Sequence, residues 1–212
     1  QLPAQAGVNR FSWDMRYPGI QLPKSAGALT EFQSVDHSPP SRPIALPGQY
    51  VVRLTVDGEA YERDFVIRMD PRVQASDADL RAQFEFLVDI RDRVSDVTDL
   101  VMRLRDVRAR IEGRGPEGPE ESGGAVEGVL EELDDIEGEL TIWMGSEKHP
   151  MMWGPPGLIQ KLSRLSGAVV MADARPTESM YAVFEDLSDR FERAGDRLNR
   201  IVGEELGDSG SR

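Results

Sequence analysis

The amino-acid sequence predicts an α+β protein, in which a small, partial Ig-like β-sandwich (residues 1–71) precedes an antiparallel bundle of four long helices (residues 76–206). Two observations predict this division. Apolar and polar side chains alternate around residue 50, as in a strand, and apolar ones recur at spacings of three and four after residue 76, as in helices. Eight of the 14 prolines also lie within residues 1–71, and proline disfavours helix interiors.

The strand pattern is clearest over Gly48–Asp70, where two alternating runs flank Asp57-Gly58. Asp-Gly favours the positive φ angles of a tight turn, so a β-hairpin is predicted here. A further strand is predicted over Asn9–Met15, with short ones near Phe32–Val35 and Pro43–Leu46. A stable sandwich has about seven strands. We therefore expect either further strands before residue 1 or a partner that covers the open edge of the sheet.

Helical periodicity begins after Ser76-x-x-Asp79, a pattern typical of a capping box. The predicted helices span Asp77–Glu112, Ala125–Met144, Leu158–Ala172 and a segment from the Thr177 cap to about Leu206. Residues 113–124 are predicted to form a flexible acidic loop, and residues 207–212 a disordered tail. Arg16, Tyr17 and Pro18, with Trp13 nearby, are expected to join the β part to the bundle.

Composition excludes several classes of function. The chain of 212 residues has a net charge of −13 and no cysteine. An acidic surface disfavours nucleic acids and anionic lipids, which bind through Lys and Arg. The lack of cysteine excludes disulfides and thiol catalysis. No apolar run reaches the roughly 20 residues of a membrane span, so any membrane association is expected to be peripheral, through a membrane complex.

No constellation of residues predicts an active site, a cofactor site or a metal site. The only histidines, His37 and His149, lie in polar, loop-like stretches without converging ligands. The acidic residues between Glu131 and Glu139 lack the spacing of a di-iron site or an EF-hand. They are expected to form a solvated helix face, with weak cation binding as the alternative. The sequence therefore predicts a protein that is not an enzyme and takes no small-molecule substrate.

A Pro-rich stretch after residue 142 is the candidate partner-binding segment, because Met and Trp are enriched at protein interfaces. Its proposed contact residues are Trp143, Met144, Met151, Met152 and Trp153. Two alternatives stay open, in which the stretch folds back to cap the bundle or lines a cofactor pocket.

Three strings carry a resemblance to a known family: VNRFSWDMRYP at residues 8–18, LPGQYVVRLTVDG at residues 46–58 and DPRV at residues 70–73. They resemble the C-terminal region of bacterial sortilin-like, BNR-repeat β-propeller proteins, often labelled glycosyl hydrolases. There an Ig-like module and a helical segment follow the propeller, which this chain lacks. The resemblance implies an exported protein, periplasmic or extracellular.

These features predict a non-catalytic structural or interaction module. It would act as an extracytoplasmic accessory subunit or scaffold that contacts a larger protein assembly, such as a photosynthetic or respiratory membrane complex. The alternative is an accessory C-terminal domain of an exported, carbohydrate-active β-propeller enzyme. An independent enzyme or metal protein is the third class.

Overall fold

The predicted hairpin forms. The computed structural model describes residues 6–19, 42–113, 122–141 and 156–207. Strands β1 (Gly48–Val56) and β2 (Glu59–Ile67) pair antiparallel from Gly48↔Ile67 to Val56↔Glu59. The turn residues Asp57 and Gly58 have φ angles of 53° and 86°, as a two-residue turn of the type favoured between twisted strands requires.

The predicted β-sandwich is not present in the described part of the chain, where the sheet has two strands. Residues 9–15 form no strand, so that prediction is wrong. Met15 has a φ angle of 55°, which interrupts extended geometry. The strand expected at Pro43–Leu46 is reduced to one bridge between Ile44 and Arg16. The strand expected at Phe32–Val35 lies outside the described residues.

Helix α2 (Asp77–Glu112) has the predicted bounds. Its capping box is also present. The Ser76 hydroxyl accepts a 3.2 Å hydrogen bond from the Asp79 amide, and the Asp79 carboxylate accepts one of 3.4 Å from the Ser76 amide. The two bonds satisfy amides that a helix N-terminus leaves without partners, which is why the helix begins at this point.

The other three helices differ from the prediction at their ends. Helix α3 spans Ser122–Leu140, helix α4 spans Leu158–Val169 and helix α5 spans Glu178–Gly207. Helix α3 thus begins inside the stretch predicted to be a flexible loop. Helix α5 follows the predicted cap, since the Thr177 hydroxyl accepts a 3.4 Å hydrogen bond from the Met180 amide.

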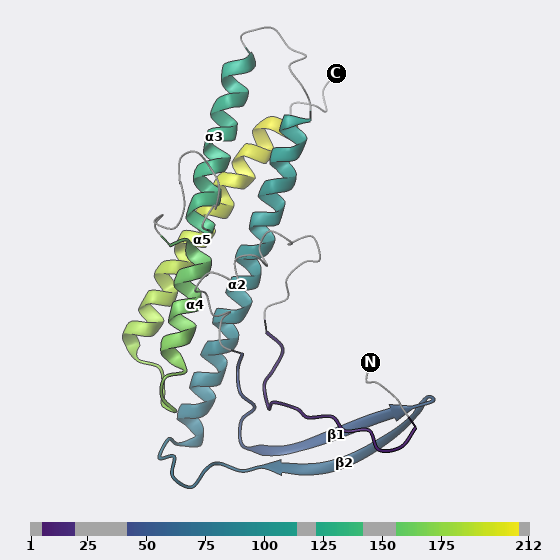
Figure 1. Cartoon of the computed structure of the whole chain (residues 1–212). Helices are drawn as coiled ribbons and strands as arrows, with labels where there is room; N and C mark the ends of the chain where they lie inside the picture. The colour runs from purple at the N-terminus through teal and green to yellow at the C-terminus, as the bar shows by residue number, and fades with distance from the viewer. Residues whose placement is uncertain (1–5, 20–41, 114–121, 142–155, 208–212) are drawn as a thin grey trace.

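The four helices occupy three rods. Figure 1 shows α2 and α5 as long rods, with α3 and α4 placed end to end beside them. Gly157, at the start of α4, abuts the end of α3 so closely that a Cβ at this position would lie 2.7 Å from Thr141 Cα. Residues 141 and 157 are therefore neighbours in space, and α3 and α4 together match the length of α2.

One apolar core holds the four helices together. Its most buried members come from every helix and include Ile90, Val97, Leu104, Leu133, Ile136, Leu140, Leu162, Leu198 and Ile201. Each such side chain contributes roughly 1.5–3 kcal/mol when it is removed from water. No helix among the described residues is long and apolar enough to cross a membrane.

The hairpin lies outside this core. In Figure 1 it projects sideways from the base of α2 as a curved ribbon. Most residues of both strands are exposed, so neither face of the ribbon is covered by the helices. The molecule thus consists of a helical body and a projecting arm, which we define as residues 6–19 and 42–69.

Candidate protein-docking surface

The arm has one apolar face and one polar face, because side chains alternate along each strand. The register places Tyr50 opposite Phe65 and Leu54 opposite Tyr61. These residues share one face with Glu59 and Arg63, which lie opposite Val56 and Val52. We call it the apolar face after its apolar members, Tyr50, Val52, Leu54, Val56, Tyr61 and Phe65. The opposite face carries the polar residues Gln49, Arg53, Thr55, Glu62 and Asp64 together with Val51, Ala60 and Val66, and Arg53 and Glu62 are joined by a 2.5 Å ion pair.

The apolar face is open to solvent. Val52 is 53% exposed, Leu54 49% and Tyr61 53%. In a complete sandwich, such residues would pack against a second sheet. Here the described residues supply no second sheet. Contiguous apolar surface of this kind marks interaction sites in soluble proteins.

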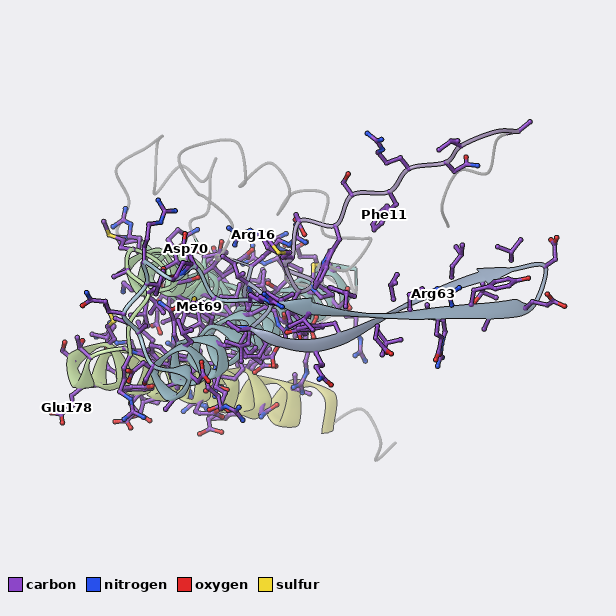
Figure 2. All side chains as sticks on the ribbon, turned by 90° about the horizontal axis from the view of Figure 1, so that it is seen from below. Phe11, Arg16, Arg63, Met69, Asp70 and Glu178 are labelled. Carbon is purple, nitrogen blue, oxygen red and sulfur yellow. The ribbon has the colours of Figure 1, made fainter. Side chains whose placement is uncertain are left out.

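The segment before Met15 covers only the base of this face. The Trp13 ring lies 6.1 Å from Tyr50 and 6.3 Å from Phe65, and the Tyr50 and Phe65 rings stack at 5.7 Å. The indole nitrogen of Trp13 donates a 3.2 Å hydrogen bond to the Arg16 carbonyl. Figure 2 shows the chain from Arg16 through Phe11 standing off one face of the hairpin, with the Phe11 side chain directed toward it.

Polar contacts fix this segment at the base of the arm. Arg42 pairs with Asp14 at 2.9 Å and donates a 3.1 Å hydrogen bond to the Tyr17 carbonyl. The Tyr17 ring meets Phe84 of α2 edge to face at 5.0 Å. Among Trp13, Arg16, Tyr17 and Pro18, the expected joint between the β part and the helices is therefore formed by Tyr17, whereas Trp13 packs on the hairpin.

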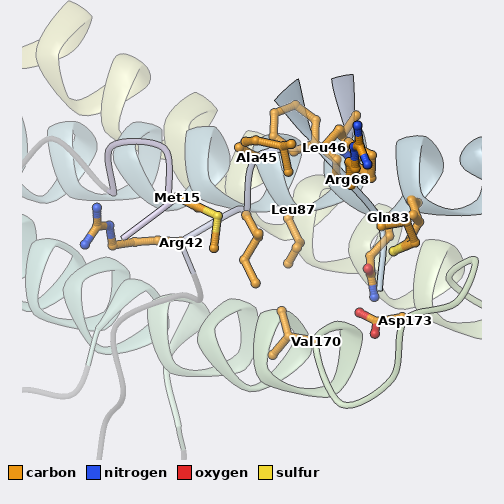
Figure 3. A pocket seen from close by; sticks show the side chains of 15 residues that line it. Met15, Arg42, Ala45, Leu46, Arg68, Gln83, Leu87, Val170 and Asp173 are labelled. Atoms are coloured by element: carbon orange, nitrogen blue, oxygen red, sulfur yellow. The ribbon is translucent and has the colours of Figure 1, made fainter. Parts of the chain in front are cut away.

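A cavity of about 240 Å³ lies where the arm meets the body. Its walls are mainly apolar and include Leu46, Ile67, Leu87 and Val170, while Arg68 and Asp173 stand among its polar lining residues (Figure 3). Gln83 also lines it, but its amide is engaged, donating hydrogen bonds of 2.7 Å and 2.6 Å to the Val169 and Ala172 carbonyls. The cavity is smaller than most cofactor pockets, which occupy about 300–1,000 Å³.

Charge is divided unevenly between the two parts of the sequence. Residues 1–75 carry eight basic and eight acidic side chains, whereas residues 76–212 carry 17 basic and 30 acidic ones. The whole net charge of −13 therefore resides in the helical part of the sequence. A partner that approaches the arm meets an apolar face without net charge, while like charge repels acidic partners from the body.

The acidic residues of α3 were predicted to form a solvated face, and Glu137 departs from this prediction. Glu137 is 1% exposed and accepts a 2.8 Å hydrogen bond from Arg105 Nε. Burial raises the pKa of its carboxyl, and the hydrogen bond and charge of Arg105 oppose that rise. Asp134, Asp135 and Glu139 are exposed as predicted. The described residues contain no group of His, Cys, Asp and Glu arranged to hold a metal ion.

The residues predicted to bind a partner, Trp143, Met144, Met151, Met152 and Trp153, lie outside the described residues, as do His37 and His149. Their roles stay predictions. Sequence reasoning did not single out the apolar face as a site. The alternation over residues 50–56 indicates an apolar face. In the predicted sandwich that face would be buried in the core, so it did not indicate a docking surface.

Comparison of the chain with protein-family models, with curated proteins and with solved structures gives no match.

Proposed function

We propose that this protein is a non-catalytic interaction module that docks onto a larger protein assembly through its arm. One observation carries the proposal: the apolar face of the hairpin is open to water although most of its side chains are apolar. An isolated two-stranded hairpin is at best marginally stable in water. Covering this face would therefore stabilise both the arm and the complex.

The helical body suits a supporting role. Its three rods are held by one core, and its surface carries ion pairs such as Arg93–Glu192 at 3.0 Å and Arg197–Glu139 at 2.7 Å. Such a body presents the arm at a defined distance from its own acidic surface. We propose an extracytoplasmic location and a role as accessory subunit or scaffold, as the family resemblance implies.

The decisive experiment replaces two apolar-face residues together, Val52→Thr and Leu54→Thr. Threonine keeps the preference for strands but removes apolar contact area. The matched control is Val51→Thr with Val66→Thr, on the opposite face of the same strands. Tagged full-length chains are expressed in the native source, and the recovered partners are quantified by mass spectrometry.

We expect the apolar-face variant to lose at least about tenfold in partner recovery, equivalent to about 1.4 kcal/mol. The control should retain most of it. Circular dichroism checks that both variants keep their helices. Equal losses in the two variants, or none in either, would contradict docking through this face. Replacing Met151, Met152 and Trp153 by Ser tests the other predicted surface in the same assay.

A second candidate function follows from the aromatic residues of the arm. Trp13, Tyr61 and Phe65 are partly exposed near one face, and aromatic rings support sugars in carbohydrate-binding modules. This favours the alternative of an accessory domain from a carbohydrate-active enzyme. Titration of soluble glucan and chitin oligosaccharides, followed by tryptophan fluorescence, tests it. A signal that Tyr61→Ala abolishes would support glycan binding over protein docking.

A further inference from the structure

The two edges of the hairpin differ in how well they are protected against further pairing. Strand β2 carries four charged residues, Glu59, Glu62, Arg63 and Asp64. Strand β1 carries one, Arg53, and Glu62 neutralises it. Proteins protect exposed strand edges with charges and prolines. Strand β1 has no proline and this single, paired charge, so its edge is the one on which a further strand can pair.

The register identifies the backbone groups that are free at this edge. A two-residue turn makes Val56 and Glu59 a hydrogen-bonded pair, and such pairs alternate along the ladder. The backbones of Val52 and Leu54 therefore face β2. Those of Val51 and Arg53, with Gln49 and Thr55, face away from it. None of these outward groups has a backbone partner within the described residues.

The N-terminal part of the arm does not fill this edge. Trp13 packs on the faces of Tyr50 and Phe65, and no backbone hydrogen bond joins residues 8–14 to β1. The positive φ of Met15 directs the chain away from a ladder position. In Figure 2 this segment stands off the ribbon rather than beside a strand.

We infer that β1 accepts, at its free edge, an extended strand from a different protein, apolar at alternate positions and basic where it reaches the hairpin tip. Backbone donors and acceptors in a row are matched only by another strand or by water. The tip carries the carboxylates of Asp57 and Glu59, and neither forms an ion pair with a described residue. A Lys or Arg at that end is therefore complementary.

Charge also argues against a second copy as the occupant. Two chains of net charge −13 repel each other, and a copy of β1 offers no Lys or Arg at either end of the strand. This inference rests on the proposed docking through the arm and adds the mode of docking. The incoming strand would extend the apolar face, since its alternate residues lie on that face.

The test uses the full chain, uniformly labelled with ¹⁵N, and a synthetic nine-residue peptide of alternating Val and Thr with Lys at one end. Amide hydrogen exchange is followed residue by residue. Without peptide, the Val52 and Leu54 amides should exchange slowly and the Val51, Arg53 and Thr55 amides fast. Saturating peptide should slow the latter three by at least about tenfold. A peptide with Glu in place of Lys should bind more weakly.

Two matched variants isolate the edge. Val51→Pro removes an outward amide from β1, and Val66→Pro removes one from β2, while proline at an outward position leaves the inner ladder intact. We expect Val51→Pro to abolish the protection and Val66→Pro to retain it. The inference is overturned if the peptide leaves the β1 amides unprotected, or protects those of Ala60 and Asp64 instead.

Concentration-dependent protection without peptide would show that a second copy occupies the edge, which also overturns the inference. The partner-recovery assay described under the proposed function distinguishes failure of strand addition from failure of docking through the arm. If Val52→Thr with Leu54→Thr loses the partner while Val51→Pro keeps it, docking through the face stands and strand addition fails. If neither change affects the partner, the proposed function itself fails.

Discussion

Arg105 of α2 donates a 2.8 Å hydrogen bond from Nε to Oε1 of Glu137 on α3, and the glutamate is 1% exposed. The second oxygen, Oε2, is buried without a hydrogen-bond partner. The pair is therefore an incompletely satisfied charge inside the helical body. A carboxylate in this position costs desolvation energy that one hydrogen bond offsets only in part.

The first prediction concerns the pH dependence of stability. Burial raises the pKa of the Glu137 carboxyl above its ordinary value of 4.5; Arg105 and Arg108 oppose this rise and Asp134 adds to it. The folded state therefore holds the proton more tightly than the unfolded state. The contribution of Glu137 to the free energy of unfolding should be greatest below the ordinary pKa and fall as pH rises through the raised one.

Glu137→Gln removes this titration. The stability advantage of the wild type over the variant should be largest at low pH and shrink as pH rises, measured by urea unfolding between about pH 4 and pH 8. Burial also raises the pKa of Asp89 and Asp96, so the difference between the chains is the relevant quantity. Glu127→Gln, an exposed change on the same helix, is the control. A difference that is constant with pH would contradict the prediction.

The second prediction tests the joint between α3 and α4. A Cβ on Gly157 would lie 2.7 Å from Thr141 N and 2.9 Å from the Leu140 carbonyl carbon. Both are backbone atoms, so Gly157→Ala must force the helices apart. We expect a loss of about 1–3 kcal/mol in the free energy of unfolding, as for overpacked cores. Any residue can adopt the φ angle of −71° found at Gly157. The expected loss of stability therefore comes from steric contact and not from backbone strain.

Gly167→Ala is the matched control, because Gly167 lies inside α4 and a Cβ there meets nothing within 4 Å. Alanine is favoured over glycine in a helix by about 1 kcal/mol, so this change should stabilise the protein. Thermal unfolding followed by circular dichroism compares the two. A neutral Gly157→Ala would show that α3 and α4 do not abut.

Local rules account for what could be predicted from the sequence. Asp57-Gly58 defines the hairpin turn and Ser76 with Asp79 defines the start of α2, since both depend only on neighbouring residues. The burial of Glu137 could not be predicted, because it depends on which face of α3 meets Arg105. The partial sandwich was predicted wrongly for a similar reason, since alternation shows that one face is apolar without showing what covers it.

The third prediction concerns the order of the arm. Trp13 is the side chain that holds the N-terminal segment on the hairpin, through Tyr50 and Phe65. Trp13→Ala should release this segment and destabilise the arm locally by about 1–2 kcal/mol, since each aromatic pair contributes about 0.5–1.5 kcal/mol. Hydrogen exchange at the amides of β1 and β2 should accelerate accordingly, while exchange within α2 and α5 stays unchanged. Phe11→Ala is the control, because Phe11 is 67% exposed and should leave exchange nearly unaffected. Accelerated exchange in the helices would show instead that the arm and the body unfold together.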